Sequence, residues 1–149
     1  CTALGSAAPD GLWAACVRGL DGDSWAPWTA MAARTRGDGA VYDRCEAELV
    51  QAVGEDGAVV GPHGPEIART AATVEALEPF DSRAARDAAE RACGFLARKQ
   101  LAEVGEPLHT GSMDGAFPLV PDGDLLRTDA TAHALLALIA WERKSRGGR

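Results

Sequence analysis

The stretch DGAFPLVPDGDLLRTDATAHAL, at residues 114–135, decides the fold because a near copy of it, DGAVVGPHGPEIARTAATVEAL, stands at residues 56–77. The copies align without a gap, and Asp-Gly-Ala, Arg-Thr, a single Ala, a single Thr and Ala-Leu recur at matching positions. One unit of this kind cannot bury its apolar face alone, so successive units are expected to stack on one another.

Each copy contains an Asp-Gly turn, a loop rich in Pro and Gly, and then a helix that opens with a Thr-bearing stretch. In the second copy, Thr128 and Asp129 can cap the first amides of that helix. Residues 130–141 are apolar at nearly every position except Thr131 and His133. A helix that is apolar all round is expected to be buried on all sides. This one is too short, and too closely flanked by charge, to span a bilayer.

The chain has 149 residues, enough for a single domain over 1–149 with a real core. Hydrophobic residues make up 46% of it and alternating β-branched or aromatic runs are missing, which predicts helices and no sheet. The formal net charge of −7 argues against a nucleic-acid partner, because a phosphate binder needs a basic face. The basic cluster at residues 143–149 is predicted to be a frayed, solvated terminus.

Four cysteines without a Cys-x-x-Cys spacing indicate neither a zinc site nor a dense disulfide framework, and buried or free thiols are expected. Cys1 stands where Met would normally begin a chain, so the sequence is either a processed product or a fragment. A fragment points to the cytoplasm, whereas a lipoprotein anchored through Cys1 would lie in the cell envelope. The four cysteines are Cys1, Cys16, Cys45 and Cys93.

Apolar periodicity predicts a repeated order of outer helix, loop and inner helix, in repeat units at about 42–79 and 83–143. Trp28-Thr29-Ala30 resembles a third, degraded copy of the Thr-Ala element. Two layers of antiparallel helices in one all-α domain follow from this order. The helices are expected at residues 10–20, from 24 to a turn at 36–40, and at 41–53, 66–78, 83–101 and 128–143.

The pattern of helix, Asp-Gly loop and Thr-Ala-x-x-Ala-Leu helix resembles the α/α-toroid repeats of squalene–hopene cyclases, class II diterpene cyclases and protein prenyltransferase β subunits. The resemblance covers roughly residues 42–141. It implies an incomplete α/α toroid of about three hairpins. It also implies a fragment or diverged member of that superfamily, acting on an isoprenoid by acid-initiated cyclisation, as an isomerase or lyase would. A further chain or a homo-oligomer would complete the ring.

In class II terpene cyclases the proton donor is the middle Asp of a DxDDTA motif at the start of an inner helix. That motif falls on residues 127–132 of this chain, where Asp129 occupies the donor position and Thr131-Ala132 match. Arg127 and Ala130 depart from the motif, and an Arg two residues away favours an ionised Asp129. The alternative is that Asp129 caps its helix or pairs with Arg127.

The resemblance also suggests which residues would contact a substrate. Arg69 and Arg127, at helix N-termini, would favour an anionic group such as a diphosphate. Trp25 and Trp28 would line the cavity, while Glu75 and His133, at equivalent repeat positions, could face a shared groove as an acid and base. The candidate binding residues are Arg127, Arg69, His133, Glu75, Trp25 and Trp28.

No cofactor and no metal are expected. Prenyltransferase β subunits bind zinc through Asp-x-Cys and a distant His, and Asp43-Arg44-Cys45 with His109 or His133 is the nearest match. The Asp-x-Cys begins an outer helix and His109 lies in an inserted loop, so the placement is wrong for zinc. The alternative function is a non-catalytic helical-repeat module that binds a protein or a small anionic ligand between the inner-helix N-termini and the loops.

Overall fold

The computed structural model describes residues 10–18, 26–61, 64–99 and 128–147. Within these residues there are six helices and one two-stranded sheet, which confirms the all-α class. The expectation of a single domain stays a prediction. The elements are α1 (Asp10–Arg18), α2 (Ala26–Arg36), α3 (Gly39–Ala52), β1 (Val60–Gly61), β2 (Gly64–Pro65), α4 (Ile67–Leu77), α5 (Arg83–Lys99) and α6 (Thr128–Gly147).

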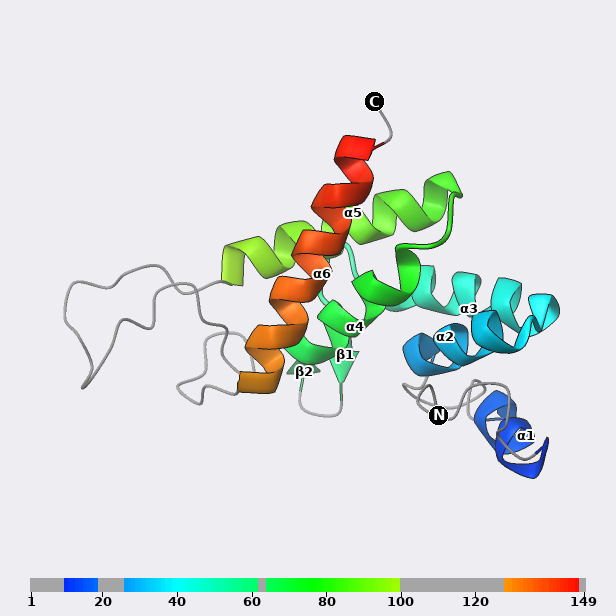
Figure 1. Ribbon diagram of the computed structural model, residues 1–149. Helices are drawn as coiled ribbons and strands as arrows, with labels where there is room; N and C mark the ends of the chain where they lie inside the picture. Colours follow the sequence, from blue (N-terminus) through cyan, green and yellow to red (C-terminus); the bar gives the residue numbers. More distant parts are fainter. Residues whose placement is uncertain (1–9, 19–25, 62–63, 100–127, 148–149) are drawn as a thin grey trace, which may run out of the picture.

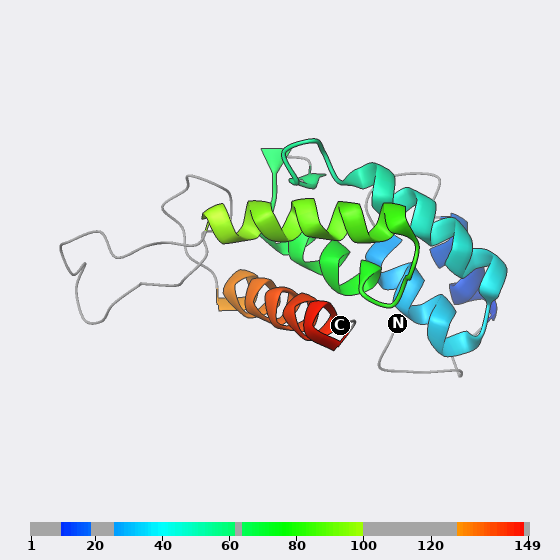
Figure 2. The same ribbon diagram turned by 90° about the horizontal axis from the view of Figure 1, so that it is seen from above.

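Helix α4 is the centre of the arrangement, because it packs against α2, α3, α5 and α6 (Figure 1). Short connections join α2 to α3 and α4 to α5, so each of these pairs forms a helical hairpin. Figure 2 shows α2, α4 and α6 running in one direction, with α3 and α5 running the opposite way on one side of them. Helices that follow one another from α2 to α5 therefore run in alternating directions (Figure 2).

The outer helices bury the stripes that the sequence pattern predicts. In α3, Cys45 and Leu49 are buried, as is Val53 directly after the helix, and Tyr42 stacks on Phe80 with ring centroids 4.2 Å apart. Helix α5 contacts the core through small side chains at helical spacing, which allow close packing. The buried residues of α5 are Ala85, Ala88, Ala89, Ala92, Cys93, Phe95 and Leu96.

The loop between α3 and α4 contains the small sheet, where the sequence pattern predicted only a loop. Val60 pairs with Pro65 and Gly61 with Gly64, and an isolated bridge joins Val53 to Val59. Gly64 adopts φ +103°, a backbone conformation that residues with a side chain rarely adopt, so this position of the hairpin favours glycine. The two strands are short and rich in turn residues, so the sequence has no alternation of apolar residues that would predict a sheet here.

Two contacts fix the loop to its neighbours. Gly57 has φ +90° and lies so close to α5 that a Cβ would stand 2.1 Å from the carbonyl oxygen of Arg91. The Thr70 hydroxyl donates to the carbonyl of Glu66 at 2.7 Å and accepts from the amide of Val59 at 3.0 Å. Thr70 thus joins the first turn of α4 to the loop before it.

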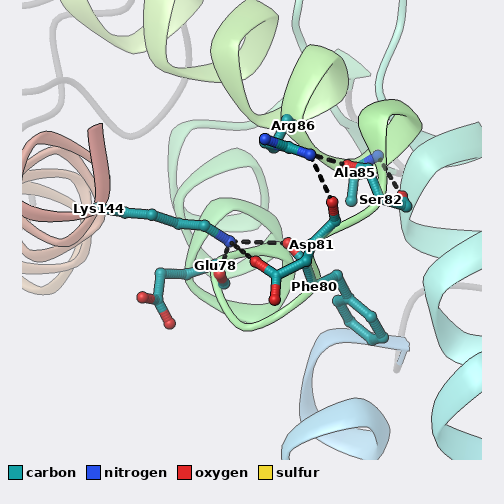
Figure 3. A network of polar contacts seen from close by, with 7 residues as sticks. All are labelled: Glu78, Phe80, Asp81, Ser82, Ala85, Arg86 and Lys144. Atoms are coloured by element: carbon teal, nitrogen blue, oxygen red, sulfur yellow. Dashed lines mark hydrogen bonds and ion pairs between the residues drawn. The ribbon is translucent and has the colours of Figure 1, made fainter. Parts of the chain in front are cut away.

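The C-terminal turns of α6 correct one prediction. The helix continues to Gly147, through the basic cluster that was expected to fray. Figure 3 shows why: the Lys144 ammonium donates to the carbonyls of Glu78 and Phe80, the latter at 2.7 Å, and lies 3.4 Å from an Asp81 carboxylate oxygen. Lys144 therefore satisfies carbonyls at the end of α4, which a helix C-terminus leaves without intrahelical partners.

The burial of α6 corrects a second prediction. Ala130, Ala134 and Ala137 are buried, but Leu135 is 40% exposed and Leu136 is 57% exposed. Among the described residues, the helix is covered on one face only. The prediction of burial on every side came from the apolar composition around the helix. That composition does not indicate which neighbouring helices are present to cover each face.

The second halves of the two copies are both helical. Ala72 and Ala76 of α4 are buried, and so are their equivalents Ala130 and Ala134 of α6. The first half of the second copy, from residue 114 to 127, lies outside the described residues. In the helices that are described, none is both long and apolar enough to cross a membrane.

Candidate functional site

Three side chains from three helices meet on the row formed by α2, α4 and α6. Nδ1 of His133 on α6 lies 3.3 Å from Oε1 of Glu75 on α4. The imidazole ring also meets Trp28 of α2 edge to face, with centroids 6.3 Å apart and planes inclined by 76°. We call these residues the Trp28–Glu75–His133 cluster.

The cluster links three helices of the row. Trp28 on α2 and His133 on α6 approach each other, and His133 also contacts Glu75 on α4, which packs against both of these helices.

The three side chains of the cluster are only partly buried. Glu75 and His133 are both accessible in part, and Trp28 is 38% exposed. With its proton on Nδ1, a neutral His133 donates to the Glu75 carboxylate and presents Nε2 as an acceptor. The cluster therefore combines an aromatic surface with a hydrogen-bonding pair that can exchange a proton.

The repeat predicted that Glu75 and His133 would share a groove, and the structure brings them into contact. The contact with Trp28 was not predicted. Aligning Thr29 of α2 with Thr73 of α4, both of which are buried, puts Met31 and not Trp28 at the position of Glu75. The degraded third copy therefore carries no signal for the contact with Trp28.

The predicted anion site is only partly within the described residues. Arg69 lies at the start of α4, where its Nε donates to Oε2 of Glu66 at 2.7 Å. Its guanidinium therefore already has a carboxylate partner. Arg127 and Trp25 lie outside the described residues. Asp129 is the second residue of α6, and its side chain also lies outside the description.

The candidate zinc ligands do not converge. Cys45 is buried and Asp43 is exposed, so the two side chains point to different sides of α3. Burial raises the pKa of the Cys45 thiol to about 11, which disfavours the thiolate that zinc requires. His109 lies outside the described residues, and no three His, Cys, Asp or Glu side chains that the structure describes are grouped to hold a metal.

A polar hollow of about 530 Å³ lies between the Asp-Gly loop and α5. Arg98 donates to the carbonyl of Asp56 at 2.8 Å and Arg91 to that of Gly54 at 3.5 Å. The guanidinium groups therefore hold the loop onto the helix, and we assign the hollow a structural role. Its lining residues are Glu55, Asp56, Asp87, Glu90, Arg91, Gly94 and Arg98.

In comparisons with known proteins, no protein-family model, no curated protein and no solved structure matches the chain. The Trp28–Glu75–His133 cluster is therefore interpreted from its own chemistry and geometry.

Proposed function

We propose that this chain is a helical-repeat module of the α/α-toroid kind that binds a small molecule at the Trp28–Glu75–His133 cluster. The observation that carries the proposal is the meeting of these three side chains, each from a different helix, on a partly exposed face. Small-molecule sites commonly combine apolar and aromatic surface with a few convergent polar groups.

The chemistry of the cluster narrows the class of ligand. Trp28 offers an aromatic face for an apolar group, and the Glu75–His133 pair offers one acceptor and one group that can donate or accept. An anion would be repelled by the Glu75 carboxylate, and Arg69 is already paired with Glu66. A neutral ligand with an apolar body and a hydroxyl group fits best, and an isoprenoid alcohol is the member of this class to which the toroid resemblance points.

The binding test uses farnesol as the probe and the side-chain nitrogen signals of Trp28 and His133 in an NMR titration. Both signals are expected to shift together and to saturate. Trp28→Leu, Glu75→Gln and His133→Asn should each weaken binding by about 10- to 100-fold, the range for a lost aromatic or hydrogen-bond contact.

Glu55→Gln supplies the matched control, because Glu55 is an exposed carboxylate of the Asp-Gly loop. It should leave farnesol binding unchanged. Shifts that are absent, or that respond equally to Glu55→Gln and Glu75→Gln, would count against this site.

A second candidate function is acid-initiated cyclisation of an isoprenoid with Asp129 as the proton donor. The toroid resemblance supports it, because Asp129 stands at the donor position of the DxDDTA motif and Thr131-Ala132 match that motif. In this candidate function, Arg127 modulates the acidity of Asp129 or contacts a diphosphate, and Trp25 and Trp28 line the cavity.

The cyclisation test incubates the protein with squalene and with geranylgeranyl diphosphate and identifies products by mass spectrometry. Asp129→Asn should abolish product formation while the helical circular dichroism stays the same. Products that persist in Asp129→Asn would remove Asp129 from the role, and the absence of any product would leave the binding module as the function.

A further inference from the structure

Helix α6 carries an exposed apolar face opposite the one that packs on α4. Its members follow helical spacing on one side of the helix, and the larger three are between 40% and 57% exposed. Ala130, Ala134 and Ala137 occupy the other side and are buried. We call this exposed face the α6 patch; its residues are Ala132, Leu135, Leu136 and Ile139.

The internal repeat shows what becomes of such a face when a neighbour is present. Val74 and Leu77 of α4 are the equivalents of Ala132 and Leu135, and they are 0% and 1% exposed. Helices α5 and α6 of the following unit pack against α4. In the part of the chain that the structure describes, no helix covers α6 in the same way.

Two members of the patch lie beyond the repeated stretch, which ends at residue 135. Leu136 and Ile139 continue the apolar face along α6, and both are exposed. Charged side chains normally occupy exposed helix positions, and an apolar face in contact with water lowers solubility unless a partner covers it.

We infer that the α6 patch is a self-association surface, on which α6 of a second copy of this chain packs antiparallel. A two-fold axis between Leu135 and Leu136 would set Ala132 of one copy opposite Ile139 of the other. A small residue then faces a large one at both ends of the patch, which allows the apolar side chains to interdigitate.

Charge favours the antiparallel direction. The last turns of α6 carry Arg143, Lys144 and Arg146, so a parallel pair would bring two basic ends together. The antiparallel pair separates these ends and opposes the two helix dipoles. The patch extends over about 10 Å of α6, so the contact between two copies is small and the dimer forms reversibly with concentration.

Sedimentation velocity across a concentration series tests the association. The unaltered chain is expected to move from monomer to dimer, and Leu136→Glu should weaken the dimer on the order of 100-fold because it places a carboxylate in the apolar contact. Val60→Glu is the matched control, since Val60 is an exposed apolar residue on β1, and it should leave the dimer unchanged. A monomer at every concentration overturns the inference, and so does a dimer that Leu136→Glu does not weaken.

Disulfide cross-linking tests the direction of pairing. In a background with Cys1 and Cys16 replaced by Ser, a mixture of Ala132→Cys and Ile139→Cys chains should cross-link far faster than either chain alone. Cross-linking of each variant with itself, and not with the other, would indicate a parallel pair and overturn the arrangement. Neither experiment depends on the proposed ligand site, because the α6 patch excludes Trp28, Glu75 and His133.

Discussion

Helices α4 and α6 carry matching sequences and meet different surroundings. Leu77 ends the repeated motif in α4 and is 1% exposed, whereas the equivalent Leu135 of α6 is 40% exposed. The difference arises because α4 packs against α2, α3, α5 and α6, whereas among the described helices α6 packs mainly on α4, with a smaller contact to α5. A repeat therefore specifies which faces of a helix can pack, while the burial of each face depends on the units that flank it.

The largest expected effect comes from truncating the two equivalent leucines. Leu77→Ala should lower the free energy of unfolding by about 3 kcal/mol, because it opens a cavity in a fully buried site. Leu135→Ala should lower it by less than about 1 kcal/mol, since the surrounding solvent fills the space. Urea denaturation at low protein concentration measures both, and equal losses would show that α6 is covered in the monomer.

A smaller effect is expected from the residue that ties α6 to the end of α4. Lys144→Met keeps the aliphatic stem but removes the donor to the carbonyls of Glu78 and Phe80. It should cost about 1–3 kcal/mol, as for a partly buried hydrogen bond to a charged group. Arg143→Met, at an exposed position in the same turn, should change stability by less than about 0.5 kcal/mol. Similar losses for the two variants would contradict the anchoring role of Lys144.

The smallest effect is a dependence of stability on alkaline pH, caused by thiols in the outer helices that cover α4. Burial raises the pKa of Cys45 to about 11 and that of Cys93 to about 12. The unfolded chain releases these protons first, so this stability is complete below about pH 9 and is lost as pH rises toward the folded-state values. Each thiol should contribute about 1 kcal/mol of loss between pH 8 and pH 10.

Urea denaturation at pH 8 and pH 10 measures this loss, and the double variant Cys45→Ala, Cys93→Ala removes both thiols. The slope that remains in the variant belongs to other groups, including Tyr42, whose pKa burial also raises. An unchanged slope in the double variant would mean that the two thiols are accessible to solvent in the folded chain.

Much of the helical layout could be predicted because it depends on local periodicity. The stripe of α5 from Ala85 to Leu96 is a face at helical spacing, and it is buried as expected. Ser82, a residue type that favours helix starts, precedes α5, and its hydroxyl accepts from the amide of Ala85 at 3.0 Å. These features lie within a few residues of one another, so the sequence alone defines them.

The rest depended on contacts between distant segments. The helical conformation of the basic end of α6 depends on the carbonyls of Glu78 and Phe80, which lie more than sixty residues earlier in the chain. The exposure of Leu135 and Leu136 depends on the absence of a covering helix among the described residues. In the candidate site the repeat identified the Glu75–His133 pair, because equivalent positions can meet across adjacent helices. It could not identify Trp28, which lies in the copy that has diverged most.

The hydroxyl of Thr70 couples the local opening of two segments. One oxygen atom accepts from Val59 and donates to Glu66, so the loop cannot leave without releasing the first turn of α4. The amides of both segments should therefore exchange with deuterium at one common rate, as a single cooperative unit. Serine in place of Thr70 would keep that coupling, and valine would let the two segments open separately.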